Sequence, residues 1–266
     1  GTLNAGSLNI ATTGDLVNVD GTLTSATDAT LAVDGQADNT RGTISATGAL
    51  TANVAGAVNN TAGKLVANQG VALSAGSLDN TQGRIQSAQA GVQLAVANQL
   101  QNGSGGTIGA ATELNVQAGS LVNANGGSLR GANDVHVAVG GALSNDGSLT
   151  AGRHTTVTAG SLQGGSTGVL GAGIQNDGTL GAAGDLLVTT TGALIANGTH
   201  LAAGNATLQG ASVDLSASQT SAANIAITAT QGNVTTSQAT VSTPGTLRVT
   251  ANAQPGQTLV NQAAKL

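Results

Sequence analysis

The stretch SLDNTQGRIQSAQAGVQLAVA, residues 77–97, decides how this chain folds. It holds an apolar-x-Asn step ending at Asn80, a glycine turn at Gly83, a short apolar step at Ile85 and an alternating apolar segment at residues 92–96. Period-2 alternation between small turn residues is typical of short β-strands and not of helices. The stretch therefore predicts three short strands and three turns.

The same pattern returns along the chain with a period of about 21 residues, which lies in the range of known solenoid repeats. Asparagine marks the pattern best. Its column runs Asn18, Asn39, Asn60, Asn80, Asn102, Asn123 and Asn145, and it resumes at Asn176 and Asn197. Neighbours among the first seven members are almost equally spaced. Such self-similarity indicates a solenoid in which every repeat forms one coil.

A second column holds the apolar residue that follows the glycine turn. Its members are Leu3, Leu23, Ile44, Leu65, Ile85, Ile108, Leu129, Leu149, Leu180 and Leu201. A single coil cannot satisfy its own backbone groups or bury its apolar edge, so each coil must pair with its neighbours. We therefore expect an all-β fold, a right-handed parallel β-helix of roughly 12 coils and roughly 60 Å, because strands lie about 4.8 Å apart and crossovers are right-handed.

The asparagine column is expected to play a structural role. Stacked amides can each donate to one neighbour and accept from the other, as in other stacked parallel strands. Asn and Gly also favour the backbone conformations that a corner requires. The pattern predicts an internal amide ladder and no chemistry at these positions.

The chain is expected to be one domain over residues 1–266, with two departures from the repeat. The interval from Asn145 to Asn176 exceeds one period by ten positions, which predicts an insertion of that length near residues 164–173. Insertions in solenoids form loops that often bind, so Gly164, Gly165, Ser166, Thr167 and Gly168 are a possible binding loop beside the simpler reading of a tolerated bulge. Residues 211–258 lose the asparagine but keep the period, which predicts variant coils.

Composition excludes several classes of protein. The chain has no Cys, Phe, Trp, Tyr or Met, and its net charge is −5. A core without aromatics must be narrow, and an acidic chain with few bases offers nucleic acid no electrostatic footprint.

The chain has no run of 18 apolar residues and no signal peptide. We therefore expect that it does not insert stably into a membrane and that it is a piece of a longer protein.

Candidate catalytic and metal-binding residues are few. His136, His154 and His200 fall at different phases of the repeat, so we expect them to point to solvent and to form no metal site. Asp146 and Asp177 follow successive column asparagines and could act as paired acids, although Asp-Gly is also a common turn. The GGSTG sequence at residues 164–168 matches a nucleophile pattern but has no strand-turn-helix context. We predict no enzyme and no cofactor.

The segments LDNTQGRIQSAQAGVQLAVANQLQN and LSNDGSLTAGRHTTVTAGSL resemble the haemagglutinin repeats of the filamentous haemagglutinin family. That family comprises bacterial two-partner secretion exoproteins, including contact-dependent growth inhibition effectors. The resemblance covers nearly the whole chain and is strongest from Asn39 to Asn145. This chain lacks the Asn-Pro motif of the family's secretion domain and any segment like a toxin domain.

The resemblance implies a non-catalytic stalk of a secreted adhesin or contact-dependent inhibition exoprotein at the bacterial cell surface. Such a stalk crosses an outer-membrane two-partner secretion transporter and presents a binding or toxin region to a host or target cell, for virulence, adhesion or toxin delivery. A receptor or glycan on that cell would be a further partner. Two alternatives stay open: a polysaccharide-cleaving β-helix enzyme that uses Asp146 and Asp177, and a segment that binds a receptor or glycan directly.

Overall fold

The computed structural model describes residues 1–181, 183–251, 258–262 and 264–265. Regular structure in this part of the chain is entirely β, so it contains no helix that could cross a membrane. The chain forms two compact units, Gly1–Gly131 and Ala132–Leu266. The single domain expected over residues 1–266 stays a prediction.

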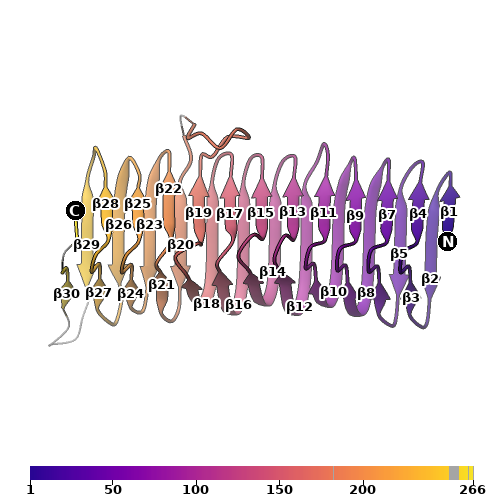
Figure 1. The fold of residues 1–266 in the computed structure, drawn as a ribbon, viewed down its shortest axis with the longest axis horizontal. Coiled ribbons are helices and arrows are strands. Elements are labelled where there is room, and N and C mark those ends of the chain that lie inside the picture. The colour runs from indigo at the N-terminus through magenta and orange to yellow at the C-terminus, as the bar shows by residue number, and fades with distance from the viewer. Residues whose placement is uncertain (182, 252–257, 263, 266) are drawn as a thin grey trace. The chain divides into compact units, whose positions relative to one another are not determined.

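The first unit builds its coils from one short strand and one longer or broken strand each (Figure 1). The short strands, which we call the first sheet of this unit, are β1 (Thr2–Ala5), β4 (Thr22–Ser25), β7 (Thr43–Ala46), β9 (Lys64–Ala67), β11 (Arg84–Ser87), β13 (Thr107–Ala110) and β15 (Ser128–Gly131). The others are β2 (Leu8–Thr12), β3 (Leu16–Val17), β5 (Ala29–Val33), β6 (Ala37–Asp38), β8 (Ala49–Asn59), β10 (Gly70–Asp79), β12 (Val92–Asn102) and β14 (Leu114–Asn123).

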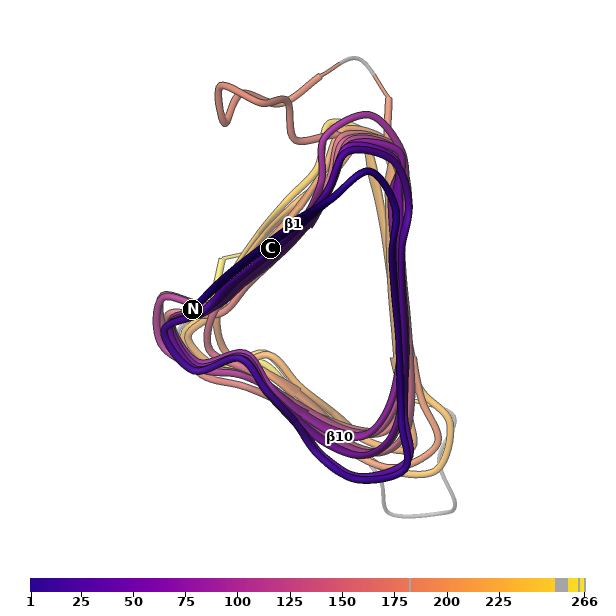
Figure 2. The same ribbon diagram turned by 90° about the vertical axis from the view of Figure 1, so that its right-hand side faces the viewer.

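A coil of the first unit follows three sides, because the longer strands bend midway (Figure 2). The bend in β10 coincides with a shift of register between Ala75 and Leu78 against β12. All strand pairs described within this unit are parallel, and Leu23 pairs with Ile44 one coil later. The apolar column thus stacks on itself.

The core of the first unit is a set of apolar ladders. On the longer strands Leu50, Val71, Val92 and Leu114 pair in successive coils, and each is at most 3% exposed. Burying such a side chain contributes about 1.5–3 kcal/mol. Because the inward residues are aliphatic and stack in register, no aromatic residue is needed to fill the narrow interior.

The second unit has the same construction with more interruptions. Its first-sheet strands are β17 (Ser148–Ala151), β19 (Val169–Ala172), β22 (Thr199–Ala202), β25 (Gln219–Ser221) and β28 (Thr240–Ser242). The others are β16 (Val135–Asn145), β18 (Thr155–Gly164), β20 (Leu186–Thr190), β21 (Leu194–Ala196), β23 (Asn205–Gly210), β24 (Val213–Asp214), β26 (Asn224–Ala229), β27 (Val234–Thr235), β29 (Leu247–Ala251) and β30 (Leu259–Val260).

Seven first-sheet strands in one unit and five in the other correspond to the roughly 12 coils expected. The parallel pairing of strands that lie one repeat period apart confirms the predicted parallel β-solenoid. The variant coils keep their pairing, since Val213 pairs with Val234 and Val234 with Leu259. Their strands are shorter, but the parallel strand pairing continues through them.

The ten extra residues lie after β19, not at residues 164–173 as predicted. Gly165 to Gly168 form an ordinary corner between β18 and β19, and β19 pairs normally with β17. The chain leaves the coil only beyond Ala172 and returns at Leu186, the start of β20. The asparagine interval gave the right length, but it could not say where within the coil the residues were added.

Candidate functional site

An internal amide ladder runs through the first unit. Each Nδ2 donates to the Oδ1 of the next asparagine at 2.7–2.9 Å, from Asn18 through Asn39, Asn60, Asn80 and Asn102 to Asn123. These side chains are at most 7% exposed. Most also donate to the carbonyl of the glycine three residues later, as Asn39 does to Gly42 at 3.3 Å. An interior polar column of this kind has little capacity left to bind a ligand.

The glycine of each N-x-x-G step is required by the ladder itself. A Cβ at Gly63 would overlap the backbone oxygen of Asn39 and would lie 2.6 Å from Asn60 Oδ1. The residue before this glycine adopts positive φ, with 54° at Ala62 and 57° at Gln82. A tight corner and a close contact with the preceding coil therefore account for the glycine.

The ladder does not continue through the second unit as expected. Leu143, two residues before Asn145, pairs with Leu162, so the residue in register with Asn145 on the next coil is Gly164. On the coil after that, Ala196 pairs with Gly164. Asn197 lies one residue beyond the column and donates to the carbonyl of Ser216 at 2.6 Å. Asn176 is exposed in the excursion that leaves the coil. The prediction was wrong for Asn176 and Asn197, since regular spacing alone cannot show a slip of register.

The excursion between β19 and β20 is a small projecting turn. Ile174 forms an antiparallel bridge with Leu180, and Gln175 donates its backbone N–H to the carbonyl of Thr179 at 2.8 Å. Leu180 is 49% exposed, so it does not continue the inner apolar column as predicted. This projection does not contain the predicted binding loop of Gly164, Gly165, Ser166, Thr167 and Gly168. A binding role for that corner stays a prediction.

Asp146 and Asp177 do not occupy equivalent positions on adjacent coils. Asp146 accepts the backbone N–H of Gly165 at 2.8 Å, which ties one corner to the next. Asp177 lies in the excursion, where hydrogen bonds from the side chain and backbone of Thr179 lower the pKa of its carboxyl. The alignment that paired acid-base catalysis would need is therefore not present, because the insertion separates the two turns.

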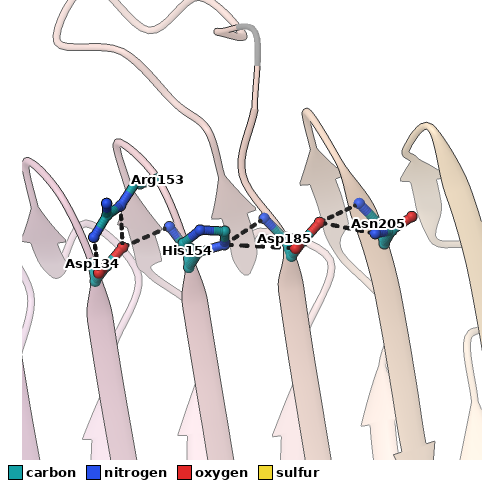
Figure 3. A network of polar contacts seen from close by, with 5 residues as sticks. All are labelled: Asp134, Arg153, His154, Asp185 and Asn205. Atoms are coloured by element: carbon teal, nitrogen blue, oxygen red, sulfur yellow. Dashed lines mark hydrogen bonds and ion pairs between the residues drawn. The ribbon is translucent and has the colours of Figure 1, made fainter.

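A chain of polar contacts links neighbouring corners of the second unit (Figure 3). Arg153 donates to both carboxylate oxygens of Asp134, at 3.0 and 2.5 Å, and this lowers the pKa of Asp134. The backbone N–H of Asp185 donates to His154 Nδ1 at 3.2 Å. Asp185 in turn accepts from the backbone and side chain of Asn205 at 2.7 and 3.1 Å.

These acids serve mainly to join coils. Asp134 accepts the backbone N–H of His154 at 3.1 Å, and in the first unit Asp28 accepts that of Ala49 at 2.8 Å. Each carboxylate thus satisfies a corner N–H of the next coil. Across the described residues, no group of three His, Asp or Glu side chains could hold a metal ion.

The side chain of His200 is buried in the second unit, contrary to the prediction. The sequence predicts that His200 faces solvent, but it is 1% exposed and pairs with Leu170 in the inner column, while Leu201 lies on the other face. Its Nδ1 is 2.9 Å from Thr220 Oγ1. Desolvation lowers the pKa of His200 to about 4, so the ring is neutral near pH 7. The prediction that Leu201 points inward is wrong, because His200 and Leu201 both fit the repeat spacing and only His200 is in register with Leu170.

Comparison with known proteins agrees with this fold. The haemagglutinin repeat family matches residues 1–54, 38–104 and 88–152, which together cover more than half of the 266 residues. No solved structure matches the chain.

Two curated proteins share part of the sequence. Toxin CdiA of Yersinia pestis is 57% identical over 101 residues, and tRNA nuclease CdiA-2 of Burkholderia pseudomallei strain 1026b is 50% identical over 102 residues. Each alignment covers 38% of this chain and 3% of the relative. The chain therefore spans a small fraction of the length of these relatives.

Proposed function

Because this chain belongs to the haemagglutinin repeat family, we propose that it is a structural filament segment of a secreted bacterial adhesin or contact-dependent inhibition exoprotein. In this role it extends from the cell surface and presents a binding or toxin region carried elsewhere in the longer protein. The parent exoprotein crosses an outer-membrane two-partner secretion transporter. The absence of cysteine supports passage of an unfolded chain, since no disulfide can form before export.

The observation that carries this proposal is the amide ladder. The ladder asparagines point inward, and each is hydrogen-bonded to the equivalent asparagine of the next coil. Their amide groups are therefore not available to a ligand. Because successive coils of the first unit repeat the same contacts, coils can be added there without a new core. Such a construction sets length, and it favours a presenting role over catalysis.

The proposed role is non-catalytic, and Asp146 provides the test. The purified chain should not depolymerise acidic or neutral polysaccharides. If it did so, and if Asp146→Asn removed the activity while Asp34→Asn did not, the polysaccharide-cleaving alternative would replace the present one. Asp34 is a matched control because it is an acid on a corner of the first unit.

The presenting role can be tested in the parent exoprotein. Residues 22–83 comprise three complete coils, because Thr22 begins β4 and Arg84 begins β11. Three further copies should lengthen the segment by about 43 Å at a strand spacing of about 4.8 Å. We expect an epitope placed after the segment to move outward by that amount in electron micrographs of whole cells. An unchanged epitope distance in a secreted, folded variant would refute the role.

A further inference from the structure

The outer face of the first sheet in the first unit is basic, although the unit as a whole is acidic. This unit contains seven Asp and Glu against four Lys and Arg, a formal charge of −3 from 4 − 7. Arg41 is paired with Asp20 at a corner. The remaining three cations, Lys64, Arg84 and Arg130, all lie at outward positions of the first sheet.

No acid accompanies them on that face. Throughout strands β1 to β15 of the first sheet, all of them described, the outward positions carry hydroxyl, amide, basic or small apolar side chains and no Asp or Glu. Within the described chain, neither Lys64 nor Arg84 has a carboxylate at ion-pair distance. The positive charges of Lys64 and Arg84 are therefore not neutralised by an acid of the described chain.

The register of the sheet sets the spacing of the cations. Lys64 pairs directly with Arg84 on the next coil. Arg84 pairs with Thr107, Thr107 pairs with Ser128 on β15, and Arg130 lies on that same strand. At about 4.8 Å per strand, Arg130 is two strands or about 10 Å beyond Arg84 along the stack. Arg130 belongs to the neighbouring outward row, which it shares with Gln86 through Gly109.

The same face carries a hollow. It has a volume of about 470 Å³, and Lys64 and Arg84 line it together with Thr24, Ser45, Asn68 and Gln86. The guanidinium of Arg84 donates from Nε and Nη2 to Gln86 Oε1, which holds it along the face. Two cations and several neutral donors and acceptors thus open onto one shallow surface.

We propose that this face binds a linear acidic polysaccharide, whose anionic groups meet Lys64 and Arg84 while its hydroxyls bond the Ser, Thr, Asn and Gln side chains. Charge-assisted bonds to carboxylate or sulfate are the strong contacts of such a site. Single-stranded nucleic acid fits less well, because the chain has no aromatic residue on which bases could stack. The site does not depend on whether the segment presents a further domain.

Binding of three polysaccharides and of single-stranded DNA to the 266-residue chain tests the proposal by titration calorimetry in about 0.15 M salt, where a Debye length of about 8 Å limits non-specific attraction. Polygalacturonate carries carboxylates, dextran sulfate carries sulfates, and neutral dextran is the blank. We expect saturable binding of at least one acidic polymer and none of dextran. The polymer that binds identifies the anionic group.

The variant Lys64→Gln/Arg84→Gln should weaken that binding roughly tenfold or more, because two charge-assisted contacts are lost. Arg41→Gln removes one charge from a corner and should change it less than about twofold. Thr43→Lys, next to Lys64 in register, should strengthen it. Circular dichroism checks that each variant is folded.

Four results would overturn the proposal. These are no binding of either acidic polymer, equal binding of single-stranded DNA, unchanged affinity in the folded double variant, and an equal loss in Arg41→Gln. The last result would mean that net charge alone attracts the polymer. The expected pattern across all variants would assign the site to this face.

Discussion

Asn60 Nδ2 donates to Asn80 Oδ1 at 2.8 Å, and both side chains are fully buried. Asn60 Oδ1 accepts in turn from Asn39 at 2.7 Å. One side chain thus satisfies a donor and an acceptor on two different coils. Removing it leaves Asn80 Oδ1 without this donor inside the protein, which is more costly than losing a surface hydrogen bond.

Asn60→Ala should lower the free energy of unfolding by about 2–4 kcal/mol, from the lost bonds and the buried groups left without partners. Asn53→Ala is the matched control, because Asn53 is an exposed asparagine on β8 of the same unit. Urea unfolding followed by far-UV circular dichroism measures both, since the chain has no Trp or Tyr. Equal effects would show that the ladder adds no stability.

Gly63→Ala should destabilise the first unit by about 2 kcal/mol or more, because the new Cβ overlaps the backbone of the preceding coil. Gly109→Ala is the control, since a Cβ there meets nothing closer than Gln86 Cγ at 4.0 Å. Both changes remove the same amount of unfolded-chain freedom. Equal thermal unfolding midpoints for the two variants would show that Gly63 does not make the close contact with the preceding coil.

His200 should make the second unit sensitive to acid. Its folded pKa, about 4, lies below the ordinary value of 6.5, so the folded state binds fewer protons than the unfolded state. The His200 contribution is therefore complete above pH 6.5 and is lost as the pH falls toward 4, by about 3 kcal/mol in total. The measurement is the unfolding free energy at several pH values between 4 and 7.

His200→Leu provides the reference for this pH dependence. Leucine restores the residue type of Leu149 and Leu170 in the same inner column and cannot titrate. The difference between the two proteins should grow below pH 6.5 and level off near pH 4. A difference that is constant with pH would show that His200 is protonated equally in both states.

Deleting residues 174–183 should leave the fold intact. The ends of the excursion already touch, since a Cβ on Gly184 would lie 2.6 Å from Gly173 Cα. The shortened connection would match the three residues between β17 and β18. We expect unfolding free energy within about 1 kcal/mol of the parent, because the cost of loop closure varies slowly with length.

A deletion of equal length inside the coil is the control for the excursion. Removing residues 194–203 eliminates β21 and β22 and part of the inner column. This variant should not fold cooperatively, as judged by circular dichroism and limited proteolysis. Loss of folding in the 174–183 variant would show that the excursion contributes to the core.

The repeat made most of the fold predictable. Inward residues such as Leu65 and Ile85, and ladder members such as Asn60 and Asn80, recur at a spacing that admits only stacked coils. The failures occurred where the spacing changed. Asn176 and Asn197 kept a plausible interval but left the column, and Leu201 was mistaken for the inward residue in place of His200.

The basic face could not be recognised from composition. A net charge of −5 indicates an acidic protein, and Lys64, Arg84 and Arg130 are far apart in the chain. Only the pairing of β9 with β11, and the placement of β15 two strands further on, brings them to one surface. The same holds for the carboxylates, which pairing places against backbone N–H groups of the next coil.

The coil, its period and its inner columns can all be read from the amino-acid sequence, because backbone pairing and apolar burial are satisfied only when similar repeats stack. The register at each irregular coil, and with it the burial of His200, the place of the excursion and the grouping of cations on one face, became known only from the folded structure. The physical reason is that strand side chains alternate between faces. A shift of one residue, which sequence spacing cannot resolve, exchanges the interior for the surface.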